Sequence, residues 1–251
     1  MSRTALPPRQ HDTTSTVILR PADKRFRSQL DWLDSWHSFS FGSHQDPAWM
    51  GFGPLRVIND DTIAAGQGFG MHPHRDMEII TVMVDGALTH TDSMGNSAVL
   101  HAGEVQRMSA GTGIVHSEMN QTGAPCRLLQ IWIEPAQLGI QPAYEQKPFE
   151  IGDNWTALIE PSACGEAMAI AQHVRLWRAK PEHQQHLALP TGEKQSLWIQ
   201  VIDGELSLHN NGTPEQSLRR GDGLGLIQDA STQREMISLS ERADVLLFAV
   251  A

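Results

Sequence analysis

The fold is decided by residues 66–120, which read GQGFGMHPHRDMEIITVMVDGALTHTDSMGNSAVLHAGEVQRMSAGTGIVHSEMN. This stretch holds two pairs of possible metal ligands, His72 with His74 and His116 with Glu118, in segments that otherwise look like β-structure. Residues two apart in a strand point to the same face. If the two strands face each other across a barrel, three imidazoles and one carboxylate converge on one point. Such a donor set suits a divalent transition metal.

The simpler interpretation of either pair is that its residues have a structural role. A lone histidine is more often a satisfied polar or core residue than a ligand, and an HxH pair occurs by chance in a chain with 12 histidines. The metal reading gains weight because both pairs lie inside one longer pattern. Pro73 stands between two of the candidate ligands and cannot donate a ladder hydrogen bond. The segment is therefore expected at a strand start, an edge or a bulge, which suits a barrel mouth.

Short β-rich segments separated by turn signals surround these residues. Strands are expected at 17–20, 55–58, 78–84, 87–91, 99–101, 106–108, 114–119 and 127–133. Asp85-Gly86 and Ser93-Met94-Gly95-Asn96 read as turns between them. Strands also resume at 157–159, 174–177 and from 196 onward. No helix-period segment interrupts the pattern, which predicts an all-β sandwich or barrel.

An internal repeat indicates two copies of one β-fold. Residues 84–88 (VDGAL) match residues 202–206 (IDGEL), and Gly103-Glu104 matches Gly221-Asp222, both at an offset of 118. The same offset carries the four candidate ligands to Pro190, Gly192, Arg234 and Met236. None of these residues is a good ligand for a divalent transition metal. The second copy is therefore expected to keep the architecture without the metal.

The order of residues resembles the two cupin motifs. The first is matched by Gly66, His72, His74 and Glu78, with Gly86 one residue late, and the second by Gly103, Gly111, His116 and Asn120, with Ser109 where proline is usual. The departures point to one branch of the cupins. HPHRDMEI, DSMGN, MSAGTGIVHSE and QIWIEP all resemble signatures of the pirin family, and the resemblance runs from about residue 30 to the C-terminus.

The resemblance implies two tandem cupin domains, each a jelly-roll β-barrel, with one divalent metal in the first. It implies Fe(II), other divalent ions being possible, and a quercetinase-like dioxygenase that opens the central ring of flavonols with O2 and releases carbon monoxide. Glu118 would be a ligand first and a possible catalytic base second. Glu78 is expected with even odds to be a hydrogen-bond partner of a ligand or a simple strand residue.

Two rival functions stay open at this point. Some pirins resemble non-enzymatic, metal-dependent regulators that act through protein partners, and such a protein would consume no flavonol. A cupin sugar isomerase is a third possibility, which lacks a visible sugar-binding signature. Fold and metal alone do not select among these, because one fold supports many functions.

Composition narrows the class of partner. The chain of 251 residues carries 19 Lys and Arg against 29 Asp and Glu, a net charge of −10. Because phosphate contacts from Lys and Arg dominate nucleic-acid binding, direct binding of nucleic acid is disfavoured. Cys126 and Cys164 are too few for a disulfide framework. The sequence shows no signal peptide and no run of 18 apolar residues, so no membrane contact and a cytoplasmic location are expected.

The expected organisation is a flexible tail at 1–14, a metal-binding cupin domain at 15–137 and a second cupin domain at 138–251. The Pro-rich stretch 134–148 is taken as the crossing between them. The aromatic segment 30–41 is expected as a packed cap over the barrel. Four further histidines of the first half, His37, His44, His90 and His101, lack ligand spacing and are expected to be structural, surface or barrel-wall residues.

Overall fold

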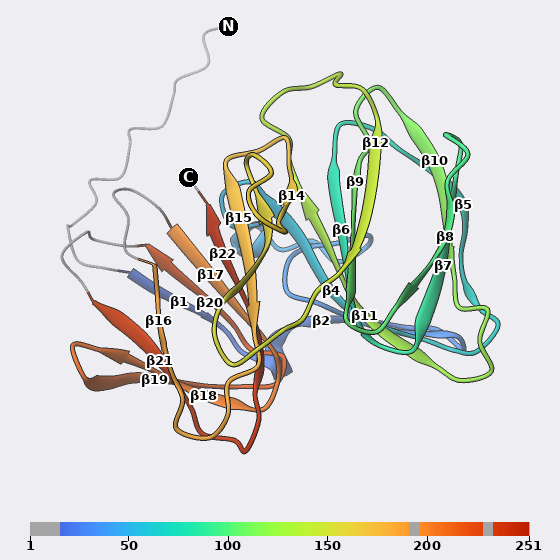
Figure 1. The fold of residues 1–251 in the computed structure, drawn as a ribbon. Coiled ribbons are helices and arrows are strands. Elements are labelled where there is room, and N and C mark those ends of the chain that lie inside the picture. The colour runs from blue at the N-terminus through green and yellow to red at the C-terminus, as the bar shows by residue number, and fades with distance from the viewer. Residues whose placement is uncertain (1–15, 191–195, 228–232, 251) are drawn as a thin grey trace, which may run out of the picture.

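The computed structural model describes residues 16–190, 196–227 and 233–250, so the predicted tail at 1–14 lies outside the described residues. Within them the chain is built of strands and two single-turn 3-10 helices, η1 (Ala22–Lys24) and η2 (Pro47–Trp49). Figure 1 shows two β-barrels side by side. The predicted all-β fold of two tandem cupin domains is confirmed.

The first barrel consists of a large sheet and a small sheet. The large sheet has the order β12 (Ala143–Pro148), β9 (Glu104–Ser109), β6 (Glu78–Asp85), β11 (Cys126–Ile133), β4 (Leu55–Ile63), β3 (Leu33–His37) and β2 (Phe26–Gln29). The small sheet has the order β5 (Gly68–His74), β10 (Ile114–Met119), β7 (Ala87–Asp92) and β8 (Ser97–His101).

The second barrel repeats this plan. Its large sheet has the order β1 (Thr16–Arg20), β20 (Gly223–Ile227), β17 (Ser196–Asp203), β22 (Asp244–Val250), β15 (Val174–Ala179), β13 (Thr156–Glu160) and β14 (Met168–Ala169). Its small sheet has the order β16 (His186–Ala188), β21 (Arg234–Ser238), β18 (Glu205–Asn210) and β19 (Thr213–Arg219). Strands β6 and β17 begin 118 residues apart, as do β7 and β18, which agrees with the predicted repeat.

Each large sheet takes an edge strand from outside its own part of the chain. Strand β1 pairs with β20 of the second barrel, and β12 pairs with β9 of the first barrel. The predicted boundary at 137/138 therefore does not follow the sheets, and part of the stretch taken as a crossing is strand β12. Both strands cover backbone groups that an open sheet edge would leave unpaired. This exchange ties the two barrels together through main-chain hydrogen bonds.

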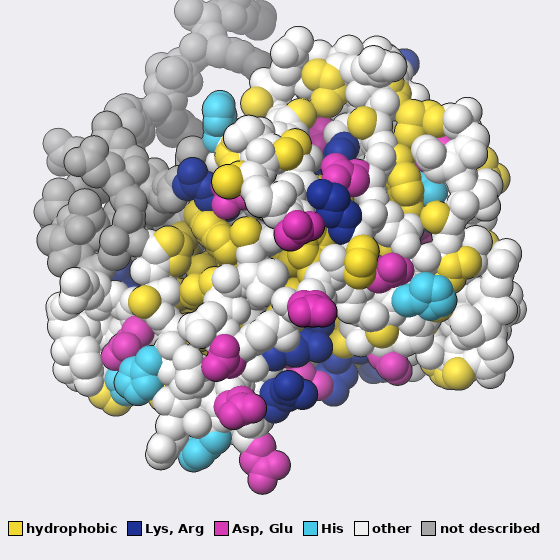
Figure 2. All heavy atoms as spheres, in the orientation of Figure 1, with side chains coloured by type: hydrophobic (Ala, Val, Ile, Leu, Met, Phe, Trp, Pro, Cys, Tyr) yellow, Lys and Arg dark blue, Asp and Glu magenta, His cyan; other side chains and the backbone are white. Residues whose placement is uncertain are grey.

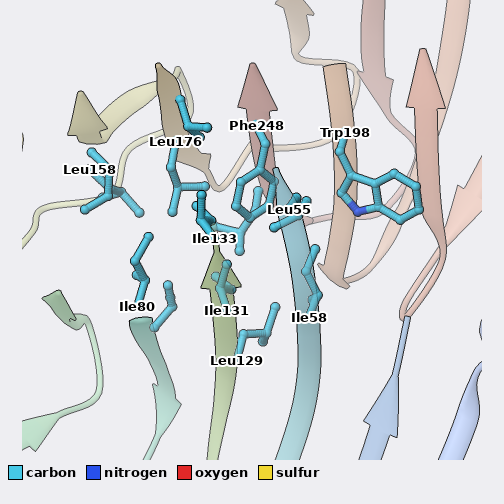
Figure 3. Close-up of a cluster of buried hydrophobic side chains, with 14 of the residues drawn as sticks. Leu55, Ile58, Ile80, Leu129, Ile131, Ile133, Leu158, Leu176, Trp198 and Phe248 are labelled. Atoms are coloured by element: carbon cyan, nitrogen blue, oxygen red, sulfur yellow. The ribbon is translucent and has the colours of Figure 1, made fainter. Parts of the chain in front are cut away.

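The two large sheets also pack face to face. Ile80, Leu129 and Ile131 of the first sheet meet Leu176 and Phe248 of the second in one buried cluster (Figure 3). Burying a side chain of this kind stabilises the fold by about 1.5–3 kcal/mol relative to leaving it exposed. Because side chains alternate along a strand, the neighbours of these residues point the other way, into the first barrel. The inner wall of that barrel is where the candidate site lies.

The aromatic segment 30–41 does not form a separate cap. Its central residues form strand β3, which pairs with β4 inside the large sheet, so that part of the expectation is wrong. Trp36 lies under the guanidinium group of Arg27, 4.8 Å from its ring centroid. Leu33 packs into a buried cluster of the first barrel, and the ring of Phe41 meets Trp132 edge-on at 5.5 Å. Pairing with β4 uses the backbone of this segment, which a loose cap would leave unsatisfied.

The described residues contain no helix long and apolar enough to cross a membrane. On the face drawn in Figure 2, Lys and Arg side chains are interspersed with Asp and Glu side chains.

Candidate metal centre

Three histidines converge on the inner wall of the first barrel. Strand β5 carries His72 and His74, and its neighbour β10 places His116 directly opposite His72. The ring centroids of the three residues lie 4.5–5.0 Å apart, and one ligand nitrogen from each lies within 4.8 Å of the others. The i, i+2 spacing on one strand and the pairing of two strands thus bring the imidazoles to one point.

The imidazoles of His74 and His116 are neutral at physiological pH. Burial, helped by the neighbouring His72, lowers the pKa of His74 to about 4. Burial and the surrounding histidines lower the pKa of His116 to about 3. A neutral imidazole keeps a lone pair for a metal ion. The Nε2 atom of His116 is buried and has no hydrogen-bond partner among the described residues, as expected of a nitrogen that binds a metal ion.

The tautomer of His72 follows from its hydrogen bond. Its Nδ1 lies 2.7 Å from the carbonyl oxygen of Gly70, which can only accept, so Nδ1 carries the proton. The Nε2 atom of His72 is therefore the nitrogen that could bind a metal ion. Metal-bound histidines commonly hold their second ring nitrogen in this way.

Glu118 lies on the same inner wall and is 2% exposed. Its Oε1 accepts hydrogen bonds from Thr81 at 3.1 Å and Gln106 at 2.5 Å, and its Oε2 accepts one from Gln130 at 2.7 Å. Burial raises its pKa, so a cation nearby would favour the ionised form. A carboxylate oxygen of Glu118 lies within 4.8 Å of ligand nitrogens of His116 and His90, a grouping that excludes His72 and His74.

Glu78 takes no part in this wall. It shares a face of β6 with Ile80 and Val82, which pack toward the second barrel, whereas Thr81 points into the first. Its carboxylate accepts a hydrogen bond from Ser109 at 2.8 Å, and burial raises its pKa. Of the two roles expected for Glu78, the structure supports that of a strand residue away from the ligands.

His90 is the residue of the site that sequence reasoning missed. It is 1% exposed and belongs to the barrel wall, not to the surface, and its Nδ1 lies 3.5 Å from Nδ1 of His116. Its Nε2 contacts Asp92 at 3.0 Å, and its ring stacks on Tyr144 at 4.4 Å. Strand β7 pairs with β10, so that His90 faces Glu118. Ligand spacing within one strand could not reveal a contact made by this cross-strand register.

Apolar side chains line the rest of the interior next to the histidines. Ile79, Met108 and Ile114 are buried there, with Trp132 and Tyr144 packed against them. The ring of Trp132 meets His74 edge-on at 4.9 Å, and its buried indole nitrogen has no hydrogen-bond partner among the described residues. A depression of about 330 Å³ is lined by His74, Ile114 and neighbouring residues that include Pro73 and Val115.

The second barrel has no comparable set at the positions related by the repeat. Arg234 stands where the first barrel has His116, and it forms an ion pair with Glu215 at 2.8 Å. Met236 is a buried apolar residue in place of Glu118. Pro190 cannot supply a ligand nitrogen, and Gly192 lies outside the described residues. Among the described residues, two groups of side chains could hold a metal ion, and both lie in the first barrel.

Comparison with known proteins places the chain in a family. The profile of the pirin family matches residues 20–133, and that of the quercetinase C-terminal cupin domain matches residues 158–250. A protein of Escherichia coli (strain K12) named quercetin 2,3-dioxygenase is 42% identical over 236 residues, which cover 92% of this chain and 97% of that protein. The chain belongs to the pirin family.

Solved structures agree with this assignment. The bacterial pirin YhhW from Escherichia coli, in complex with nickel(II), superposes on this pirin with a TM-score of 0.87 at 40% identity. The match covers 94% of this chain and 99% of that one. A quercetin 2,3-dioxygenase from Acinetobacter baumannii has a TM-score of 0.74 at 19% identity, covering 92% of this chain and 85% of that one, and shares the fold.

Proposed function

We propose that this pirin is a metal-dependent dioxygenase that opens the central ring of flavonols such as quercetin with O2 and releases carbon monoxide. The observation that carries the proposal is the convergence of His72, His74 and His116 beside an apolar, aromatic wall. The relative named quercetin 2,3-dioxygenase supports the choice of reaction. O2 and a small aromatic substrate are the proposed reactants.

In this proposal His72, His74, His116 and Glu118 hold one divalent ion. We propose Fe(II), and other divalent ions are compatible with the same nitrogen and oxygen donors. The nickel(II) complex of the E. coli pirin supports a site that takes a divalent transition metal. When bound, the ion would supply Lewis acidity and the electronic coupling to O2 that closed-shell side chains lack.

The chain's own residues would bind the flavonol and move its proton. Glu118 would accept the proton of the flavonol hydroxyl, since burial has raised its pKa toward the range of an effective base. Thr81, Gln106 and Gln130 donate to its carboxylate and fix the position of its oxygens. The transferred proton would reside on an oxygen of Glu118 until the ring opens.

The apolar wall would orient the substrate and exclude water. In this proposal Met108 and Ile114 would provide apolar contacts for the flavonol rings, and Trp132 would provide an aromatic one. The indole N–H of Trp132, which has no partner within the described part of the chain, would donate a hydrogen bond to a flavonol oxygen. Satisfying a buried donor in this way favours an oxygen-bearing ring system over a hydrocarbon of the same shape.

The test is turnover under controlled metal loading. Protein prepared without oxygen and loaded with Fe(II) is mixed with quercetin and then with air, while the flavonol absorption band and released carbon monoxide are followed. We expect the band to bleach with release of carbon monoxide, and we expect neither with metal-free protein. A metal-loaded protein that consumes no flavonol would contradict the proposal and favour the regulatory alternative.

We also propose the cytoplasm as the working compartment. Both cysteines are free, with Cys126 buried and Cys164 exposed. Unpaired thiols of this kind are typical of a reducing compartment. Detection of the protein in the soluble fraction of cells lysed after removal of the periplasm would support this location, and its release with the periplasmic contents would contradict it.

A further inference from the structure

We propose that Asp92 and His90 form a positioning pair that fixes the tautomer and ring orientation of His116 and thereby sets how tightly the site holds its metal. The inference rests on the proposed metal centre and deepens it. His90 acts through His116 in this proposal and contacts neither metal nor substrate. The Asp92–His90 pair gives a function to DSMGN, a sequence motif that the ligand set does not use.

The contacts form a line through the interior of the barrel. Oδ2 of Asp92 lies 3.0 Å from Nε2 of His90, and Nδ1 of His90 lies 3.5 Å from Nδ1 of His116, a long hydrogen bond. The side chains of Asp92 and His90 are 0% and 1% exposed. In the pairing of β7 with β10, Asp92 is the direct partner of His116. Water is therefore excluded from both contacts.

The positions of the protons follow from the donors and acceptors along this line. An ionised carboxylate only accepts, so Nε2 of His90 carries a proton and donates it to Asp92. With its proton on Nε2, the His90 ring offers Nδ1 as the acceptor in its contact with His116, and His116 donates through its own Nδ1. The Nε2 atom of His116, which has no other partner among the described residues, is left with its lone pair free.

The motif DSMGN anchors the start of this line. Oδ1 of Asp92 accepts the backbone N–H groups of Met94 at 2.9 Å and Asn96 at 3.1 Å. Oδ2 also accepts from the side-chain amide of Asn96 at 2.8 Å. Tyr144 stacks on the His90 ring at 4.4 Å with an interplanar angle of 20°. The carboxylate is held by a turn and the imidazole by a stacked ring, so neither is free to rotate.

This arrangement argues for a positioning role over direct ligation by His90. Ligand atoms of His90, His116 and Glu118 lie within 4.8 Å of one another, so ligation is the competing interpretation. With Nε2 bound to Asp92, however, only Nδ1 of His90 could ligate, and it is already directed at Nδ1 of His116. One nitrogen cannot serve both contacts. The hydrogen bond also leaves His116 in the tautomer that ligation through Nε2 requires.

The experiment measures metal binding and needs no flavonol. Nickel(II) affinity is determined by competition with a chelator for the full-length wild type, His90→Phe, His90→Gln and Asn96→Ala. Loss of a partner that orients a metal ligand costs about 10–100-fold in affinity, which is the expected loss for His90→Phe. His90→Gln restores an acceptor oxygen and should bind more tightly than His90→Phe. Asn96→Ala, which loosens Asp92 from a partly exposed turn, should show a smaller loss.

A matched control separates positioning from general damage to the barrel. His37 is also 1% exposed in the same barrel and contacts Asn59 at 2.8 Å, away from the candidate ligands. His37→Phe should lower the unfolding temperature as His90→Phe does, with nickel affinity unchanged. X-ray absorption of the nickel-loaded proteins should count the same number of imidazoles at the metal in wild type and His90→Phe.

Two outcomes would overturn the proposal. Unchanged nickel affinity in His90→Phe would show that the Asp92–His90 pair does not act on His116. Loss of one imidazole from the metal in that variant would show that His90 is a ligand. Absence of flavonol turnover in the wild type would contradict the proposed reaction but not the role of the Asp92–His90 pair, because nickel affinity is measured without substrate.

Discussion

His72 and His116 are direct partners across strands β5 and β10, with ring centroids 4.5 Å apart. Their separation is set by strand pairing, so it is maintained whether or not a ligand is present. Preorganised ligands lose little freedom on binding, which favours affinity. The third imidazole, on His74, follows two residues later on the same face of β5.

Replacing His116 by alanine should therefore empty the centre. We expect His116→Ala to lose most of its bound metal and to retain the barrel, because a buried imidazole with an unpartnered nitrogen adds little to stability. Elemental analysis of the purified variant checks the prediction, with circular dichroism as the test of folding. His101, an exposed histidine on β8, provides the control. His101→Ala should keep full metal content, and a His116→Ala protein with wild-type metal content would refute the ligand assignment.

Glu118 should matter for chemistry as well as for binding. In Glu118→Gln one of the two acceptor oxygens becomes an NH2 group, which faces the donor of either Gln106 or Gln130, and the base is lost. Removing a general base costs about 10²–10⁴-fold in rate, so we expect flavonol turnover to fall by that factor. Stopped-flow decay of the quercetin band measures it, with metal content determined in parallel.

The matched control for Glu118 is the other buried glutamate, Glu78. Glu78 lies on the face of β6 that packs toward the second barrel, and its side chain does not contact the site. Glu78→Gln should therefore keep the turnover per bound metal of the wild type. Equal losses of turnover in the two variants would mean that burial of a carboxylate, and not its place at the site, explains the effect.

The ligand pairs could be read from the sequence because their geometry is local. Residues two apart share a face of a strand, so His72 and His74 on one strand and His116 and Glu118 on another could be grouped without knowing the fold. His90 could not be found in this way. Its contact with His116 depends on which residues of β7 and β10 stand opposite each other, and register is a property of the paired strands.

The overall architecture shows the same division. The strand pattern, the turn signals and the repeat at an offset of 118 residues predict two β-barrels, because each can be found by inspecting the sequence alone. The exchange of β1 and β12 has no such pattern. An edge strand pairs through its backbone, which every residue possesses, so its sequence does not name the sheet that it will join.

Trp132 should contribute to substrate binding without holding the metal. Trp132→Phe keeps an aromatic ring beside His74 and removes the indole N–H that has no partner among the described residues. A lost hydrogen bond is worth about 0.5–1.5 kcal/mol, so we expect KM for quercetin to rise roughly 2–10-fold with metal content unchanged. Trp36→Phe, at a partly exposed site on β3, is the control. A KM equal to that of the wild type would exclude the proposed contact.

Asp61 should make stability depend on pH. It is buried next to Ser35, which donates a hydrogen bond to it, and burial raises its pKa to about 7 from an ordinary value of 3.8. The folded protein therefore binds this proton more tightly than the unfolded chain. Stability from this group is fully present below pH 3.8 and is lost as the pH rises through 7.

Asp61→Asn removes that dependence, because the amide stays neutral and can still accept from Ser35. Relative to the wild type, the variant should gain on the order of 2–4 kcal/mol in free energy of unfolding between pH 4 and pH 8. Urea unfolding at the two pH values, with equal metal loading, measures it. Asp34 is the control of opposite sign: its hydrogen bond to Arg27 lowers its pKa, so Asp34→Asn should lose stability above pH 4. A difference between Asp61→Asn and the wild type that is the same at both pH values would mean that Asp61 is ionised in the folded protein throughout this range.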